Sequence, residues 1–283
     1  MKVLMIFVVT VVIIIFLFWF KNPAPQTLGE SIKSKISPIA EVILKTLKDA
    51  QGTYAVVFKN LKTGDVYHLN DQKKFAAGSL YKLWILGETY AQIEGGLIAR
   101  DETLNDSLDS LNQRYGSSES SGGMVTFALQ DAIKEMITVS NNYAAFLLTD
   151  RITIASTSSF LTEYGFKDSL VGNEGLPTTT ALDMANFFEK IYRGKIINPT
   201  ASSEILEILK KQTLNQKIPK YLPPETKIAH KTGEVENFSH DAGIVFTDKG
   251  DYILVVMSET DLPGFANEEI AKLSKAVYDY VTN

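Results

Sequence analysis

Ser79 and Lys82, three residues apart, are the first pair of side chains in this sequence that could do chemistry. Residues three apart share one face of a helix, so a helix beginning near Ser79 would bring the Lys82 ammonium close to the hydroxyl. A serine becomes a good nucleophile only when a neighbouring base accepts its proton. Backbone N–H groups at a helix start can also stabilise developing negative charge. The alternative interpretation is a helix N-cap followed by a solvated lysine.

A second group, Ser140-Asn141-Asn142, follows one apolar helical pattern and precedes another. The Ser140 hydroxyl could pass a proton to a leaving group, and the Asn142 amide could hydrogen-bond a substrate amide. A polar helix cap is the alternative interpretation of this group.

The third group, Lys231-Thr232-Gly233, comes at the end of a predicted strand. A strand edge can pair with an extended, peptide-like substrate. Lys231 and Thr232 could bind a substrate carboxylate, and Gly233 would let the substrate approach the backbone closely. The same three residue types recur at 62–64, but there they fall in a hairpin turn, where the glycine serves the turn.

The composition excludes several kinds of site. The chain has no cysteine, which excludes disulfides, thiol catalysis and thiolate metal sites, and its three histidines lack the spacing of a metal-binding pair. We therefore expect neither a metal nor a cofactor. The net charge of -5 gives no electrostatic basis for binding nucleic acid.

In this order, the three groups resemble the S-x-x-K, S-x-N and K-T-G motifs of the class A β-lactamase and penicillin-binding serine enzyme superfamily. The resemblance extends from about Ile32 to the C-terminus and includes residues 177–180 and 240–245. It implies that Ser79 is the acylated nucleophile, that Lys82 is the base or part of its proton network, and that Ser140 shuttles protons. The residues it implies for substrate binding are Asn142, Lys231, Thr232, Gly233 and Glu234.

Within that resemblance, the backbone N–H groups of Ser79 and Glu234 would form an oxyanion hole. A positive Lys231 nearby would lower the pKa of Lys82 and so favour its neutral form.

Two features depart from the family pattern. Asn141 stands where these lactamases usually have aspartate. The segment 166–176 is short where a longer loop would supply a glutamate that activates the deacylating water, and Glu174 is its only glutamate. A catalytic Glu174 would make Glu174→Gln slow deacylation more than acylation, whereas an exposed loop residue is the alternative.

The elements that must position these groups follow from the hydrophobic spacing. We expect helices at 32–47, 80–94, 142–152, 180–192, 202–211 and 267–281, and one more capped by Thr126. Strands are expected at 54–58, 66–69, 227–231, 242–247 and 252–258. Because strands come from both chain ends, we predict an α+β fold of the β-lactamase and transpeptidase kind. It would have one antiparallel sheet flanked by helices, an inserted all-helical lobe, and the active site between the lobes.

The chain divides into an N-terminal membrane anchor with a linker, residues 1–26, and a catalytic domain, residues 27–283. In that domain the α/β lobe would take about 27–78 and 212–283, and the helical lobe about 79–211. The anchor rests on residues 3–20, which are apolar except for Thr10 and would span roughly 27 Å as a helix. We expect a monomer of the cell membrane with one pass and an extracytoplasmic catalytic domain, secreted if the anchor is cleaved.

The leading functional hypothesis is a β-lactamase-like serine hydrolase that opens β-lactam rings through an acyl-enzyme at Ser79. The alternative, which the short loop favours, is a D-alanyl-D-alanine carboxypeptidase or penicillin-binding protein acting on cell-wall peptides. A third hypothesis, a non-enzymatic penicillin sensor, needs a cytoplasmic output. Only Met1 and Lys2 would remain inside the cell to provide it.

Overall fold

The computed structural model describes residues 37–172 and 175–283. Residues 42–283 form one compact unit, which contains all three chemical groups. Met1–Glu41 is a separate unit, of which only the beginning of helix α2 (Pro38–Thr46) is described. The predicted anchor, residues 3–20, lies outside the described residues. In the part of the chain that is described, no helix combines the length and the apolar character needed to cross a membrane.

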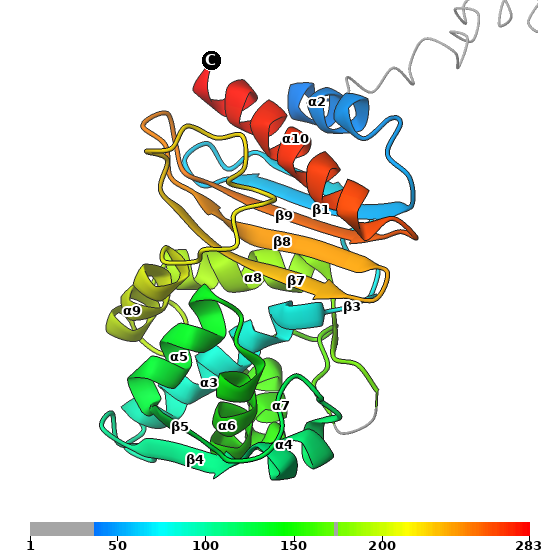
Figure 1. The fold of residues 1–283 in the computed structure, drawn as a ribbon. Coiled ribbons are helices and arrows are strands. Elements are labelled where there is room, and N and C mark those ends of the chain that lie inside the picture. Colours follow the sequence, from blue (N-terminus) through cyan, green and yellow to red (C-terminus); the bar gives the residue numbers. More distant parts are fainter. Residues whose placement is uncertain (1–36, 173–174) are drawn as a thin grey trace, which may run out of the picture. The chain divides into compact units, whose positions relative to one another are not determined.

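Five antiparallel strands form the main sheet, in the order β2-β1-β9-β8-β7. Their bounds are β1 (Thr53–Asn60), β2 (Val66–Leu69), β7 (Ile228–Val235), β8 (Phe238–Val245) and β9 (Tyr252–Glu259). The β1–β2 hairpin and the β7–β8–β9 meander come from opposite ends of the unit, and β1 joins them by pairing with β9 along its whole length. The predicted sheet built from both chain ends is thus confirmed (Figure 1).

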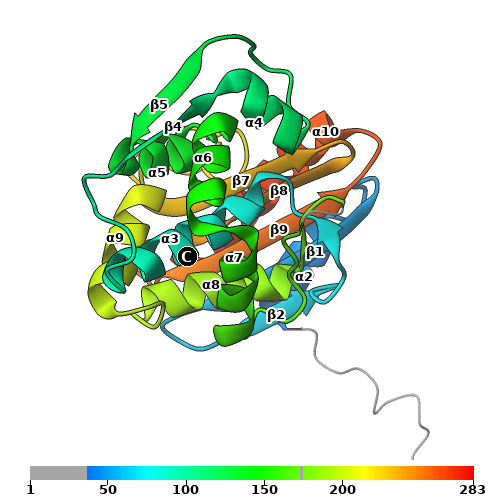
Figure 2. The same cartoon turned by 90° about the horizontal axis from the view of Figure 1, so that it is seen from below.

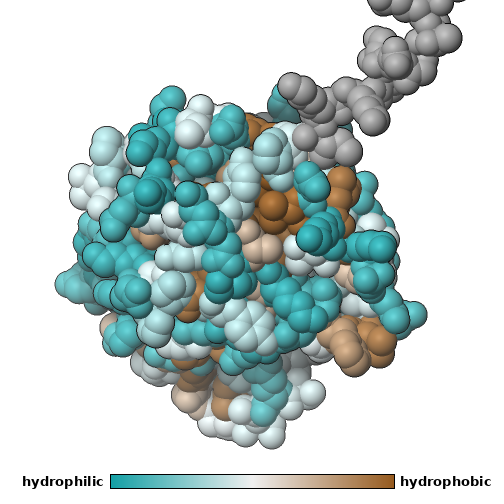
Figure 3. All heavy atoms as spheres, turned by 90° about the horizontal axis from the view of Figure 1, so that it is seen from above, coloured by the Kyte–Doolittle hydropathy of each residue, from teal (hydrophilic) through white to brown (hydrophobic). Residues whose placement is uncertain are grey.

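Helices cover both faces of this sheet. Helix α10 (Pro263–Thr282) lies over one face and α8 (Ala181–Tyr192) over the other (Figure 1). Residues 252–257 of β9 are fully buried for that reason, and their run is apolar without alternation. Figure 3 shows that the side of the molecule carrying α10 is mostly hydrophilic, with scattered hydrophobic residues.

The remaining helices form the other layer, seen from below in Figure 2. They are α3 (Lys82–Glu94), α4 (Leu108–Tyr115), α5 (Leu129–Thr138), α6 (Asn142–Ile152), α7 (Ile154–Glu163) and α9 (Pro199–Leu209). A small hairpin of β4 (Thr103–Ser107) and β5 (Met124–Ala128) borders them. A second two-stranded pair, β3 (Phe75–Ala76) with β6 (Thr178–Thr179), leads into the turn at Gly78–Tyr81 that carries Ser79, called the nucleophile turn below.

One local prediction is wrong. Thr126 does not cap a helix, because it lies inside β5, opposite Asn105 of β4. Helix α5 begins three residues later, at Leu129, and no side chain caps it. The strand pairing with β4 satisfies backbone groups that a helical turn would otherwise have used.

Candidate active site

Ser79 lies in a short 3-10 helix, η1 (Gly78–Tyr81), and helix α3 begins at Lys82 directly after it. The predicted position of the serine at a helix start is therefore confirmed. The turn is anchored from outside, because the Ala77 N–H donates to the Pro177 carbonyl at 2.7 Å.

Two glycines allow η1 to lie directly against β7. A Cβ on Gly78 would lie 2.6 Å from the Glu234 nitrogen, and a Cβ on Gly233 would lie 2.6 Å from the Ala77 carbonyl oxygen. Gly78 also has a φ of 48°, which disfavours other residues. The sequence assigned Gly233 to the approach of substrate, but its neighbour is the nucleophile turn. The K-T-G group also lies inside β7 rather than at the end of a strand, because β7 continues to Val235.

Lys82 is fully buried, and its side-chain nitrogen has three acceptors. They are the Ser140 carbonyl at 2.6 Å, Asn142 Oδ1 at 2.7 Å and Ser140 Oγ at 3.2 Å. Burial lowers the pKa of Lys82 from 10.5 to about 7, and the negative charge of Glu119 opposes this effect. The predicted direction of the shift is confirmed, but burial is its main cause, rather than Lys231.

Ser140 connects two lysines. Its Oγ accepts hydrogen bonds from Lys82 at 3.2 Å and from Lys231 at 3.0 Å. A hydroxyl has two acceptor lone pairs, so these bonds leave its own proton free to be donated elsewhere. Ser140 has a φ of 60°, a strained value for a residue with a Cβ, and such strain is typical of functional positions.

Asn141 and Asn142, the other two residues of the second group, have different roles: the first caps a helix and the second contacts Lys82. Asn141 caps α6 by accepting from the Ala144 N–H at 3.0 Å, a role that needs only an acceptor oxygen and that aspartate could also fill. Asn142 instead turns into the site, where its oxygen accepts from Lys82. Its amide nitrogen donates to the Glu119 carboxylate.

A cavity of about 260 Å³ brings these groups together. The residues lining it are Ser79, Ser140, Asn142, Leu214, Gln216, Lys217, Thr232 and Glu234. Lys217 was not foreseen. Its side chain is almost completely buried, and its nitrogen lies 2.7 Å from a Glu234 carboxylate oxygen and donates to the His240 carbonyl at 3.1 Å.

Lys231 is more enclosed than the sequence suggested. Its side chain is fully buried, and its nitrogen donates to Ser140 Oγ and, at 2.9 Å, to the Thr232 carbonyl. Burial lowers the pKa of Lys231 well below its usual value, and repulsion by Lys82 adds to the effect. Thr232 and Lys217 line the cavity and Lys231 does not, although Lys217 is itself almost fully buried and paired with Glu234.

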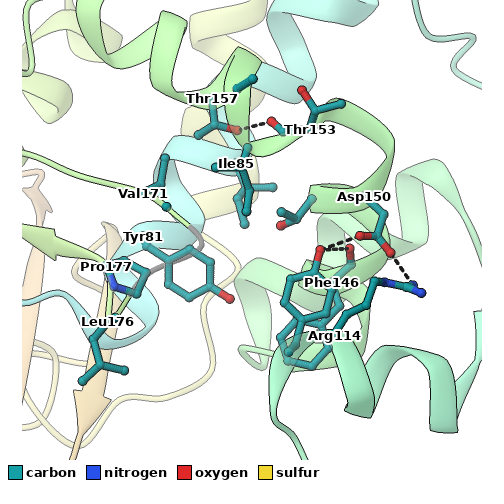
Figure 4. A pocket seen from close by; sticks show the side chains of 16 residues that line it. Tyr81, Ile85, Arg114, Phe146, Asp150, Thr153, Thr157, Val171, Leu176 and Pro177 are labelled. Carbon is teal, nitrogen blue, oxygen red and sulfur yellow. Dashed lines mark hydrogen bonds and ion pairs between the residues drawn. The ribbon is translucent and has the colours of Figure 1, made fainter.

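Glu174, predicted to activate the deacylating water, lies outside the described residues. Described residues on either side of it help to line a second cavity of about 750 Å³, into which the Tyr81 ring points (Figure 4). Among the described residues lining this cavity, Asp150 is the only carboxylate. It accepts from the Tyr115 hydroxyl at 2.6 Å and pairs at 2.6 Å with Arg114, which it shares with Asp106.

Within residues 37–172 and 175–283, no cluster of three histidine, aspartate or glutamate side chains could hold a metal ion.

The sequence did not reveal that Glu119 contacts Asn142 or that Lys217 lines the cavity. Both Glu119 and Lys217 belong to segments without regular structure, where no periodic pattern marks a side chain as inward-pointing. The only available signal was the polar loop at 117–123, whose composition identified it as a loop and nothing more.

Comparison with known proteins agrees with this geometry. Residues 37–281 match the model of the β-lactamase enzyme family. No curated protein matches the sequence.

Several solved structures share the fold. A β-lactamase from Sphaerobacter thermophilus has a TM-score of 0.77 at 19% identity, over 87% of this chain and 97% of the other. A variant of PBP-A, solved as an acyl-enzyme complex with penicillin G, has a TM-score of 0.76 at 25% identity, over 86% of this chain and 95% of the other. A class A β-lactamase from Bacteroides cellulosilyticus has a TM-score of 0.73 at 21% identity, over 85% and 96% of the two chains.

Proposed function

The chain belongs to the β-lactamase enzyme family, and from that premise we propose that it is a class A-like serine hydrolase that opens β-lactam rings through an acyl-enzyme at Ser79. The observation that carries the proposal is the buried Lys82, one helical turn from Ser79, whose nitrogen bonds to Ser140 and Asn142. A lysine with a pKa of about 7 is partly neutral at physiological pH, so it can act as a base.

Acylation follows from these contacts. Neutral Lys82 takes the proton from the Ser79 hydroxyl while the oxygen attacks the lactam carbonyl carbon. The carbonyl oxygen becomes negative, and the backbone N–H groups of Ser79 and Glu234 stabilise it. The close approach of Gly78 to Glu234 supports this pairing of the two N–H groups.

The ring then opens when the carbonyl–nitrogen bond breaks. Ser140 gives its proton to the departing nitrogen, and the proton held by Lys82 restores the Ser140 hydroxyl. Water completes the cycle by attacking the ester at Ser79, which releases the opened product and the free serine. The two hydrogen bonds that Ser140 accepts support its role as the donor, because its own proton is not needed for either of them.

The substrate carboxylate is proposed to lie near Thr232 and Lys217. Both line the cavity with Ser79, and Lys217, which pairs with the Glu234 carboxylate at 2.7 Å, supplies a positive charge. The buried Lys231 acts on this region indirectly, because it donates hydrogen bonds to Ser140 Oγ and to the Thr232 carbonyl.

The test is hydrolysis of a chromogenic cephalosporin by the purified full chain, together with intact-mass measurement. We expect steady turnover and a penicillin adduct on Ser79, with both lost in Ser79→Ala. Ser117→Ala, a serine in the polar loop, is the matched control and should keep both activities. A wild-type chain that neither hydrolyses the cephalosporin nor forms an adduct would exclude the proposal.

The alternative substrate is a D-alanyl-D-alanine peptide. Two observations favour it: the short segment 166–176, and the likeness to PBP-A, whose variant was captured as a penicillin G acyl-enzyme. A peptidase of this kind would show a single burst of acylation and then a long-lived adduct, instead of steady hydrolysis. Release of D-alanine from a model peptide would identify it directly.

The protein is proposed to be a monomer held at the cell membrane by residues 3–20, with its catalytic unit outside the cytoplasm. The apolar run of these residues supports the anchor. Both candidate substrates occur outside the cytoplasm, which supports the orientation. Loss of membrane association when residues 1–26 are deleted is the expected result of a fractionation experiment.

A further inference from the structure

A carboxylate approaches the site from the loop between α4 and β5. Glu119 accepts a hydrogen bond from the amide nitrogen of Asn142. Neither the three motifs nor the mechanism above gives this residue a task. Its position is defined by its neighbour Ser120, whose N–H donates to the Tyr143 hydroxyl at 2.9 Å and whose carbonyl accepts from Asn112 at 2.6 Å.

The contact fixes which way the Asn142 amide points. An amide can rotate by half a turn, exchanging its oxygen and its nitrogen. With the nitrogen bonded to the Glu119 carboxylate, the oxygen must face Lys82, and it accepts from that lysine at 2.7 Å. A flipped amide would place its NH₂ group against the Lys82 nitrogen and its oxygen against the carboxylate, and would lose both hydrogen bonds.

Glu119 also provides charge. The charged groups facing Lys82 are Lys231 from β7, which shares Ser140 Oγ with it, and Glu119 from the loop. Lys217 and Glu234, on another wall of the cavity, form a pair of their own. Glu119 is therefore the negative charge that acts on Lys82, whose pKa it raises, whereas Asp241 and Glu234 are the negative charges that act on Lys231.

We propose that Glu119 is a positioning residue for the acylation of Ser79: its carboxylate locks the Asn142 amide toward Lys82 and holds negative charge beside the proton-accepting lysine. The inference rests on the proposed function, since it concerns the same acylation step. Asn142 keeps its second amide hydrogen for the substrate, so the lock and substrate binding are compatible.

Two substitutions at Glu119 separate its effect on the orientation of the Asn142 amide from the effect of its negative charge on Lys82. Glu119→Gln keeps an acceptor oxygen for Asn142 but removes the charge. In this variant, the pH below which acylation by penicillin slows should be lower than in the wild type by about half a unit to one unit. Its acylation rate at pH 8 should stay within about threefold of the wild-type rate. Glu119→Ala removes both, and we expect the same shift together with a rate roughly tenfold lower at every pH.

The matched control is Asp109→Asn. Asp109 accepts from the Gly122 N–H at 3.0 Å, so it supports the same loop without touching Asn142 or Lys82. Its pH limb should stay at the wild-type position, whereas a shift equal to that of Glu119→Gln would assign the effect to the loop.

An unshifted limb in Glu119→Gln, or a wild-type rate in Glu119→Ala, would overturn the inference. Failure of the proposed function has a different signature, because the wild-type chain itself would then form no adduct on Ser79.

Discussion

At the scale of single residues, the main feature of the site is that two buried lysines share the hydroxyl of Ser140. Lys82 and Lys231 both donate to Ser140 Oγ, yet each is removed from water, so each favours its neutral form. Burying two positive charges this close would be costly, and lowering both pKa values avoids much of that cost. A lysine with a pKa of about 7 is partly neutral at neutral pH, as the role proposed for Lys82 requires.

The pH dependence of acylation should follow Lys82. The pKa of Lys82 is about 7, so below that pH the lysine carries a proton and cannot accept another from Ser79. The acylation rate of the wild-type chain should therefore fall about tenfold for each pH unit below 7 and level off above 8. Stopped-flow acylation with penicillin between pH 5 and 9 measures this, with circular dichroism at each pH to verify the fold. A rate that stays flat down to pH 5 would contradict it.

The motif residues could be predicted, and their partners could not. The spacing of Ser79 and Lys82 placed them on one helix face, and the resemblance of the three motifs to a known family supplied their roles and that of Lys231. Glu119 and Lys217 reach the site from loops, where the direction of a side chain depends on tertiary contacts. The burial of Lys231 likewise depends on neighbours distant in sequence.

At the scale of elements, the site depends on how closely η1 approaches β7. Backbone meets backbone there, at Gly78 against Glu234 and at Gly233 against Ala77. The expected oxyanion hole of Ser79 and Glu234 implied that the helix start and the strand lie together, but the sequence did not reveal that their backbones touch at Gly78 and Gly233. It also missed β4, β5, α4 and α7. The 103–107 strand is short and polar, and α7 is rich in serine and threonine, so neither carries a clear hydrophobic period.

Gly233→Ala should disable acylation by pushing η1 away from β7. The new methyl would lie 2.6 Å from the Ala77 carbonyl oxygen and 2.9 Å from Leu80 Cγ, so the nucleophile turn must move. We expect a loss of acylation rate of about a hundredfold or more, because displacements near 1 Å can have that effect. Burst kinetics with a chromogenic cephalosporin measure it.

Gly264→Ala is the control for that substitution. Nothing lies within 4 Å of its new methyl, and the residue is in the first turn of α10. It should keep the wild-type acylation rate and a stability equal or slightly higher, since alanine favours helices. Equal rates for Gly233→Ala and the wild type would show that η1 tolerates the displacement.

At the scale of the whole molecule, His240 connects the sheet to the nucleophile turn. It is fully buried on β8; its Nδ1 accepts from the Ser258 N–H at 3.1 Å, so its Nε2 carries the proton donated to the Ala76 carbonyl at 2.8 Å. The neutral ring thus makes both hydrogen bonds at once. A protonated ring would have no acceptor for Ser258 and would place a charge in the core, which is why burial lowers the pKa of His240 to about 4.

The stability of the fold should consequently depend on His240 between pH 6.5 and 4. In that window the unfolded chain binds a proton on this histidine and the folded chain does not, so acid favours unfolding. Above pH 6.5 both states are neutral there and the effect vanishes. The free energy of unfolding of the wild type should thus fall by about 3 kcal/mol more across this window than that of His240→Gln, which has no such proton to bind.

Urea unfolding at pH 4, 5, 6 and 7 measures the difference. Parallel loss of stability in the wild type and His240→Gln would mean that His240 does not couple the sheet to the nucleophile turn through its neutral form.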